Sequence, residues 1–494
     1  MDQLLNGFAS ALSMTNFIAC FVGCLIGTIV GVLPGLGPTA TLTLMIPFTL
    51  RYGATTGLIM MAGCFYGAQF GGSTTSILVN IPGEASSVIT CIDGYQMTKK
   101  GRGGAALAVA AGGSFIAGTI GIIGLQFFGP LLGNAALSFG PPEYFGFLVL
   151  AILVLSVLTG KSSLKGFLML GLGVWISMVG LSATDSVPRF TFGSMQLMLG
   201  IGFLPVVMGL FGITEVLVTA AETYRRAITK KVRLKELYPN KEELKRSVFP
   251  TIRGSILGFF VGLLPGPSAV LSTFISYAIE KKLSKTPQEF GEGMIEGVAG
   301  PESANNSAVM GSMIPLLTLG IPFTPSAAVM MAGLEMHDVG LGPLLLKNNP
   351  ELFWTFIAAM YIGNIMLLVL NLPLVGLFAR VAVIRPQILM PFIGIICLLG
   401  VYSVRNSFLD VWVMIFAGVV GVLFRKLDYP LAPLIIGLIL GPMIENNTRK
   451  TLMMFQGNVF EIFDKPIAMV FLSLAFVFIV FKFLFFYFHN KREI

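Results

Sequence analysis

The sequence predicts an all-α polytopic membrane protein: two inverted-topology repeats, each with a Pro/Gly-broken helical hairpin and a second broken helix, plus a C-terminal span. Three observations predict this class. The chain of 494 residues is 55% hydrophobic and only 11% charged, whereas about a quarter of residues are charged in soluble domains. Apolar runs of about 20 residues, enough to cross a bilayer, recur between Phe17 and Phe488. The 58 glycines and 27 prolines favour helices that are broken within the membrane.

Each predicted repeat begins with an apolar hairpin that a Pro-Gly pair breaks at its centre. The hairpins cover residues 17–50 and 252–279, and a second interrupted segment follows each of them, at 57–92 and 300–335. Four plainer apolar spans complete each repeat. These spans are 105–130, 144–160, 166–182 and 197–222 in the first half, and 352–372, 388–403, 411–424 and 431–445 in the second.

Short sequence matches between the halves indicate an internal duplication. Three pairs of segments match in the same order and at nearly the same spacing, which a chance resemblance does not explain. The pairs are 31–35 (GVLPG) with 262–266 (GLLPG), 68–82 with 308–322, and 205–210 with 433–438.

A basic segment separates the two repeats. Residues 225–246 hold nine Lys or Arg against three Glu, a composition typical of a cytoplasmic loop, and we expect no nucleic-acid partner. The sequence therefore predicts four regions. They are a first membrane repeat at 1–224, a cytoplasmic linker at 225–246, a second membrane repeat at 247–460, and a C-terminal transmembrane anchor with its tail at 461–494.

The positions of Lys and Arg predict the orientation of the repeats. The linker and the basic C-terminal tail are expected on the cytoplasmic side, and a single span at 467–488 precedes the tail. The second repeat then ends on the side opposite to its start, so the repeats are inverted. The segment 449–465 is an exception, because it carries three basic residues on the expected outer side.

Four polar tracts stand beside the predicted breaks, at 34–43, 73–87, 265–273 and 303–312, and none contains Lys or Arg. A helix that starts inside the membrane points free N–H groups and a partial positive charge at its surroundings, so an anion can bind there without an arginine. A local bond from a Ser or Thr hydroxyl to its own helix is the alternative at each position, and for Gly71 and Gly72 close helix packing is an equally good interpretation. The candidate substrate ligands are Thr39, Thr41, Ser73, Thr74, Thr75, Asn80, Ser268, Asn305, Asn306 and Ser307.

Two acidic residues in these tracts are candidates for cation coupling. Glu84 and Glu302 lie in apolar surroundings, where an ionisable group is a functional candidate, although capping of a helix at an interface is the alternative. Gly35 and Gly266 offer unwound carbonyls that suit Na⁺ or, with the carboxylates, a proton relay. Other acidic residues stand closer to the membrane ends, where we expect solvation or capping: Asp93, Glu292, Glu296, Glu335 and Asp338.

The sequence offers little to a catalytic or metal-cofactor function. The five cysteines are scattered through apolar segments and favour packing. With two histidines and no H-E-x-x-H or G-x-S-x-G motif, we expect neither an enzyme nor a cofactor. The first 13 residues lack a basic region, so we expect the first apolar segment to be retained rather than cleaved.

The motifs at the breaks resemble those of a known family. GVLPGLGP at 31–38, YGAQFGGS at 66–73 with NIPG at 80–83, and GPESANN at 300–306 look like the large membrane subunit (TctA type) of the tripartite tricarboxylate transporters. The resemblance runs over nearly the whole chain.

This resemblance implies a multi-pass secondary transporter of the bacterial inner membrane, with a periplasmic N-terminus and a cytoplasmic C-terminus. The implied partners are a small four-span membrane subunit and a periplasmic solute-binding protein; whether copies of the chain form a homo-oligomer stays open. The implied activity is uptake of a citrate-like di- or tricarboxylate by symport with a cation, often Na⁺. By analogy with other inverted-repeat carriers, an elevator-like movement is a hypothesis.

Two alternatives stay open at this point. An anion channel, or a partner-gated facilitator for organic acids, would conduct without a cation gradient, and a channel would show a ring of charged residues that the sequence does not reveal. An intramembrane enzyme would need a nucleophile with its base or a metal site, and only scattered Ser and Glu are available.

Overall fold

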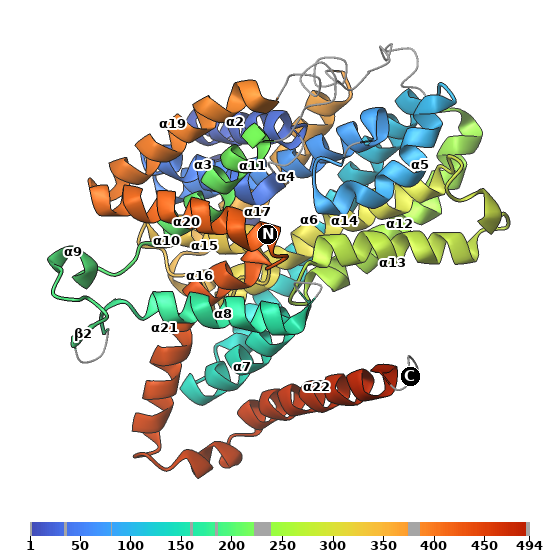
Figure 1. Cartoon of the computed structure of the whole chain (residues 1–494). Coiled ribbons are helices and arrows are strands. Elements are labelled where there is room, and N and C mark those ends of the chain that lie inside the picture. The colour runs from blue at the N-terminus through green and yellow to red at the C-terminus, as the bar shows by residue number, and fades with distance from the viewer. Residues whose placement is uncertain are drawn as a thin grey trace.

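The computed structural model of the chain is almost entirely helical (Figure 1). It describes residues 2–33, 37–80, 82–158, 162–182, 186–221, 239–373 and 386–490. By length and composition, six helical stretches of these residues can cross a membrane, which makes the chain a multi-pass membrane protein. The six are Met14–Gly31, Gly103–Ala136, Phe203–Ala220, Pro350–Asn371, Phe408–Lys426 and Leu431–Met454.

The first half follows the predicted order of a hairpin, an interrupted segment and further spans, with one short strand pair near its end. Its elements are α1 (Asp2–Ala11), α2 (Met14–Gly31), α3 (Gly37–Thr49), α4 (Ala54–Val79), the 3₁₀ turn η1 (Ala85–Ser87), α5 (Val88–Lys99), α6 (Gly103–Ala136), α7 (Pro141–Leu158), α8 (Ser163–Ser177), β1 (Gly180–Leu181), β2 (Pro188–Arg189), α9 (Met195–Met198), α10 (Phe203–Val207), the π-helical turn η2 (Met208–Ile213) and α11 (Thr214–Ala221).

The second half repeats this order and adds the C-terminal helix. Its elements are α12 (Lys241–Gly262), α13 (Ser268–Leu283), η4 (Pro287–Glu289), α14 (Glu296–Ile314), the π-helical turn η5 (Pro315–Leu319), α15 (Pro325–Glu335), α16 (Leu345–Asn348), α17 (Pro350–Asn371), α19 (Pro386–Arg405), α20 (Phe408–Lys426), α21 (Leu431–Met454), η6 (Val459–Asp464) and α22 (Pro466–Asn490).

A seam of glycines joins the first helix of each hairpin to the interrupted helix that follows it. At six positions the missing glycine side chain lets one helix lie directly on a carbonyl oxygen of the other, and a Cβ would overlap that oxygen. The contacts are Gly23 with Met60, Gly27 with Cys64 and Gly31 with Ala68 between α2 and α4, and Gly254 with Gly300, Gly258 with Ala304 and Gly262 with Ala308 between α12 and α14.

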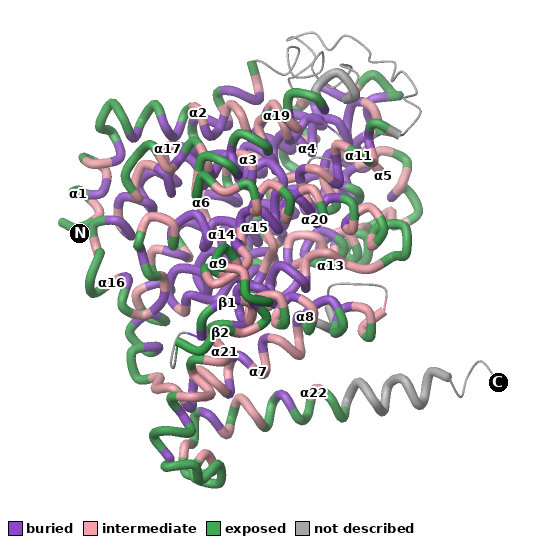
Figure 2. Tube along the Cα trace, turned by 60° about the vertical axis from the view of Figure 1, so that its left-hand side comes forward, coloured by how far each residue is buried: buried purple, intermediate pink, exposed green. Residues whose placement is uncertain are grey.

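One contact in each seam, Gly31 with Ala68 and Gly262 with Ala308, involves residues that the sequence matches had paired, and the other contacts follow at the same four-residue spacing in both halves. This repetition supports the internal duplication, whereas the inverted orientation of the repeats stays a prediction. The halves also exchange helices: α6 packs on α12 and α14 of the second half, and α17 packs on α2 and α4 of the first. Figure 2 shows that buried residues gather along α4, α6, α14 and α15, while α22 runs apart from this centre and contacts α7.

Residues with positive φ mark where the interrupted helices end. Asn80 (φ 58°) caps α4 and Gly320 (φ 67°) follows η5, and this left-handed conformation suits Asn and Gly better than other residues. α15 then begins with a standard start, because Thr324 accepts a hydrogen bond from the N–H of Ala327 and Pro325 occupies the first turn.

The structure corrects the predicted position of two polar tracts. Residues 73–75 lie within the continuous helix α4, and residues 303–312 lie within α14; the breaks come later, after Val79 and after Leu319, where the π-helical turn η5 that continues α14 ends. The glycine at 71 packs against the carbonyl of Thr28, so the packing interpretation holds for it. The tracts at the hairpins do stand where α3 and α13 begin.

We predict that an added methyl group in a seam destabilises the protein. Gly258→Ala should lower the free energy of unfolding by about 1–3 kcal/mol, because overpacking forces the backbones of α12 and α14 apart. Gly112→Ala is the matched control: nothing lies within 4 Å of a Cβ there, and alanine favours a helix by up to about 1 kcal/mol. Thermal unfolding of the purified chain measures both, and equal stability of the two variants would contradict the seam.

Candidate functional site

A cavity of about 490 Å³ lies where the starts of three helices and one break meet. This volume falls within the range of roughly 300–1,000 Å³ that is usual for small-molecule sites. Both hairpins and both interrupted segments contribute to its wall. The lining residues at the helix starts and at the break are Gly37 and Thr39 at the start of α3, Pro82, Gly83, Glu84 and Ser86 around η1, Pro267 and Ser268 at the start of α13, and Thr324 and Ser326 at the start of α15. Gln69 of α4 and Ser312 of α14 add further polar side chains.

The cavity has a positive character that comes mainly from helix ends. The first turns of α3, α13 and α15 line it, and each contributes the positive end of a helix dipole. Arg425 of α20 is the one positively charged side chain that the described residues place in the wall. Its guanidinium donates to the carboxylate of Glu215 at 2.7 Å.

Direct hydrogen bonds hold the hairpin ends against the start of α15. The hydroxyls of Thr39 and Ser326 lie 2.9 Å apart. The backbone N–H of Gly266, at the second break, donates to the carbonyl of Phe323 at 3.2 Å. Gly266 has φ +125°, a conformation that essentially only glycine adopts. The three polar starts are therefore one connected structure.

A buried polar network lies behind the Glu84 side of the cavity. The Asn305 amide donates to the Glu84 carboxylate at 3.2 Å, and the Gln69 side chain lies against the same carboxylate. Deeper in the protein, Glu302 is 1% exposed; it accepts hydrogen bonds from the hydroxyl of Ser73 at 2.5 Å and from that of Thr90.

This network contains two carboxylates and only neutral donors. Among the described residues, no Lys, Arg or His pairs with Glu84 or Glu302. A buried carboxylate without a positive partner is costly. The arrangement therefore favours uptake of a cation or a proton at these groups.

Comparison with known proteins agrees with this geometry. A family model described as the tripartite tricarboxylate transporter TctA family matches residues 17–436. The chain belongs to the TctA family. Membership implies a transport role, rather than catalysis, and partner subunits.

Two similar proteins come from Agrobacterium vitis. One, described as the uncharacterized 52.8 kDa protein in TAR-I ttuC' 3'region, is 44% identical over 478 residues, which cover 96% of this chain and 95% of that protein. The other, described as the uncharacterized protein in TAR-II ttuC' 3'region, is 43% identical over 220 residues, which cover 44% of this chain and 91% of that protein. No solved structure matches the chain.

The structure of this TctA-family chain brings many of the predicted site residues together. Thr39, Ser268 and Glu84 line the cavity, and Asn305 joins Glu84 to the buried network. The other members of the network among the predictions are Ser73, Glu302 and Asn306, whose amide donates to the hydroxyl of Ser114 at 2.7 Å and to the carbonyl of Glu302 at 3.0 Å.

Other predicted site residues stand apart from the cavity. The hydroxyls of Thr41 and Thr75 donate to carbonyls of their own helices, Gly37 and Gly72, as the local alternative expects. Asn80 is exposed at the end of α4. Thr74 lies beside Ser73 on a smaller cavity, the buried Ser307 hydroxyl has no hydrogen-bond partner among the described residues, and Gly35 lies outside the described residues.

Sequence reasoning missed several residues of this region of the TctA-family chain. Four of them are neutral polar side chains on helices, and a single polar residue in an apolar sequence is only a weak signal of a site. Arg425 had no signal, because it stands at the end of a plain span far from the motifs. The missed residues are Gln69, Thr90, Ser114, Ser326 and Arg425.

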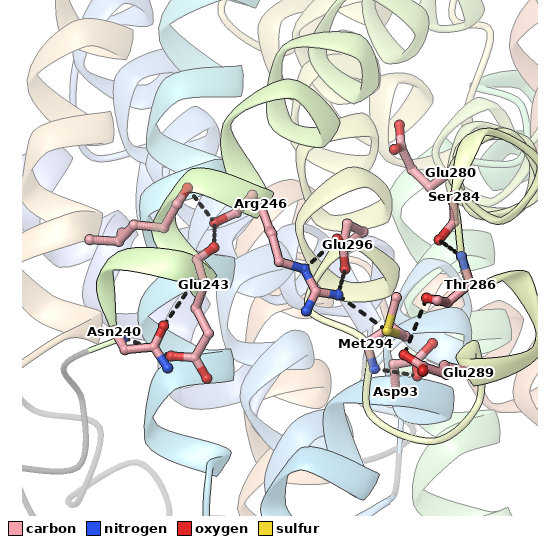
Figure 3. A network of polar contacts seen from close by, with 12 residues as sticks. Asp93, Asn240, Glu243, Arg246, Glu280, Ser284, Thr286, Glu289, Met294 and Glu296 are labelled. Atoms are coloured by element: carbon pink, nitrogen blue, oxygen red, sulfur yellow. Dashed lines mark hydrogen bonds and ion pairs between the residues drawn. The ribbon is translucent and has the colours of Figure 1, made fainter.

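Asp93, in the middle of α5, connects the two halves (Figure 3). Its carboxylate is fully buried and accepts hydrogen bonds from the N–H groups of Gly291, Gly293 and Met294 at 2.7–2.9 Å, and from the hydroxyl of Tyr277 at 2.9 Å. The prediction of solvation or capping was wrong for Asp93, because its carboxylate is fully buried and its backbone donors lie in the loop before α14 rather than in the first turn of a helix. Arg246 and Glu296 form an ion pair close by, at 2.7 Å.

We predict that Asp93→Ala destabilises the protein more than any loss of surface charge. Three N–H groups, one buried and two half-buried, would lose their acceptor, which costs up to about 1–3 kcal/mol for each. Glu292→Ala, which removes an exposed carboxylate from the same loop, is the control and should stay near the wild type. The fraction of protein that stays folded on heating measures the difference. Equal melting temperatures of the two variants would show that the bonds of Asp93 do not stabilise the fold.

Proposed function

We propose that this chain is the membrane carrier subunit that imports an organic carboxylate, of the citrate-like di- or tricarboxylate class, by symport with a cation. We further propose that the cation is Na⁺. The observation that carries the proposal is the cavity at which α3, α13 and α15 begin. It unites the four places where the sequence interrupts its helices.

The cavity suits a solute with more than one carboxylate. Three separate helix starts present their positive ends to the cavity, and the start of a helix can bind an oxyanion without a charged side chain. The hydroxyls of Ser268 and Ser326 stand at two of these starts. Arg425 adds one formal positive charge, already shared with Glu215. Several helix N-termini with partial positive charge, which approach from different directions, can bind the separate carboxylates of a small polyanion. A single fully charged side chain would contact only part of such a solute.

Symport follows from the carboxylate in the same wall. Glu84 lines the cavity, and like charges repel strongly where little water screens them. A polyanionic solute would bind poorly beside an ionised Glu84. A cation bound near Glu84 and Glu302 removes this repulsion, so solute and cation each favour binding of the other.

The remaining parts of the proposal come from the family resemblance. The proposed partners are the small four-span membrane subunit and a periplasmic solute-binding protein, and the proposed site of action is the bacterial inner membrane, with the N-terminus outside and the C-terminus inside. An elevator-like movement would carry α2 to α5 and α12 to α15, which the glycine seams join in pairs, past the other helices.

The test is uptake of labelled citrate into cells that express the chain with its candidate partner subunits. We predict uptake that depends on an inward Na⁺ gradient, and Asn305→Ala should reduce it roughly tenfold or more, because loss of a hydrogen bond to a charged group costs about 1.5–3 kcal/mol. Asn447→Ala, which removes an amide that donates to the Met443 carbonyl of its own helix α21, is the control at matched membrane levels.

Other outcomes would change the proposal. Gradient-dependent uptake that Asn305→Ala leaves unchanged would indicate that the solute binds elsewhere in the protein. Downhill flux that ignores every cation gradient would contradict symport and favour a channel or a partner-gated facilitator. Na⁺-driven uptake of a different organic acid would support the carrier function and show that citrate is not the substrate.

A further inference from the structure

A second, much smaller cavity lies behind the buried network. Its volume is about 20 Å³, enough for a single water-sized particle. It lies between α4 and α6 of the first half and α14 and α17 of the second. Five polar side chains line it, and the rest of its wall is apolar. The polar residues are Ser73, Thr74, Ser114, Glu302 and Asn371.

Asn371 shows that this cavity is built for an occupant. The residue is 7% exposed, and its amide nitrogen donates to the carbonyl of Leu367 at 2.9 Å. This bond directs the side-chain oxygen away from its own helix, and that oxygen is buried without a hydrogen-bond partner among the described residues. A buried acceptor without a donor is rare and costs about 1–3 kcal/mol. A positive ion or a donor in the cavity would satisfy it.

We propose that this cavity is a Na⁺ site. Its side chains offer only oxygen: three hydroxyls, the Asn371 carbonyl and one carboxylate. Hard cations prefer such ligands. The single negative charge of Glu302 balances a monovalent ion, whereas a divalent ion would leave a positive charge in an apolar wall. The described residues hold no cluster of three His, Cys, Asp or Glu that would suit a transition metal.

The site explains how a cation can act on the solute cavity. The Ser73 hydroxyl of α4 donates to the Glu302 carboxylate of α14 at 2.5 Å, so an ion in the cavity that binds both oxygens would further fix the two helices to each other. One turn further along the same helices, Gln69 and Asn305 reach Glu84 in the wall of the larger cavity. Na⁺ binding would therefore set the position of the groups that hold Glu84. This step rests on the proposed carrier function, but the site itself does not.

The test measures Na⁺ binding without any solute or transport. The full-length chain is purified in lipid nanodiscs, and its melting temperature is recorded in NaCl, KCl and choline chloride at equal ionic strength. A ligand that binds only the folded state raises the melting temperature. We expect NaCl to raise it well above the other salts in the wild type.

Asn371→Leu is the informative variant, because it keeps the volume and removes the unpaired oxygen. We expect a roughly tenfold or greater rise in the Na⁺ concentration that gives half of the stabilisation, as expected when one ligand of about 1.5 kcal/mol is lost. Asn364→Leu is the matched control. Asn364 is equally buried on the same helix, but its amide donates to Phe115 and Thr119 outside the cavity. The Asn364→Leu variant should lower the melting temperature and leave the Na⁺ concentration for half of the stabilisation unchanged.

Ser114→Ala provides a second variant of small volume change if Asn371→Leu does not fold. An equal rise in the melting temperature of the wild type in NaCl, KCl and choline chloride would contradict the Na⁺ site. An unchanged Na⁺ response in both cavity variants would contradict it as well. A response that follows pH and not Na⁺ would overturn it in favour of a proton on Glu302. A clear Na⁺ response in a chain that imports no carboxylate would keep the site and contradict only the proposed function.

Discussion

Close backbone contact between α2 and α4, and again between α12 and α14, is the constraint on which the rest of the structure depends. Lipid offers helices little hydrophobic reason to associate, so packing must come from direct contact, and only glycine allows carbonyl oxygens to approach this closely. The six seam contacts place each hairpin against its interrupted helix. The starts of α3, α13 and α15 meet at one cavity because these helix pairs are held in this way.

The second constraint is electrostatic. The chain keeps Glu84 and Glu302 in its centre among hydroxyls and amides, although apolar or paired residues would cost less. Such a network is stable only when something positive joins it. The solute cavity favours the opposite charge, because the N-terminal ends of its helices attract an anion. Asn305 and Gln69, which lie against Glu84 at the wall of the cavity, come from α14 and α4, the helices that carry Glu302 and Ser73. A change at one carboxylate is therefore expected to act on the other through these two helices.

Much of this fold could be predicted from the sequence, because its signals are local. Apolar length indicated the spans, Pro and Gly indicated the hairpin breaks, and repeated motifs indicated the duplication. The exact breaks of α4 and α14 were displaced, since small and hydroxyl residues serve packing and internal hydrogen bonds as readily as they end a helix. The residues that could not be foreseen act across long sequence distances. Arg425, Ser114 and Asp93 gain their meaning only from partners brought in by the other half.

The measurement that tests the account most directly is the affinity of citrate for the purified chain, by titration calorimetry, at increasing Na⁺ and constant ionic strength. The account predicts that saturating Na⁺ tightens citrate binding by roughly 5- to 150-fold, the range of typical couplings between sites, and that citrate tightens Na⁺ binding by the same factor. Citrate binding that is measurable but equally strong in Na⁺ and in choline would contradict the claim that one network serves both ions.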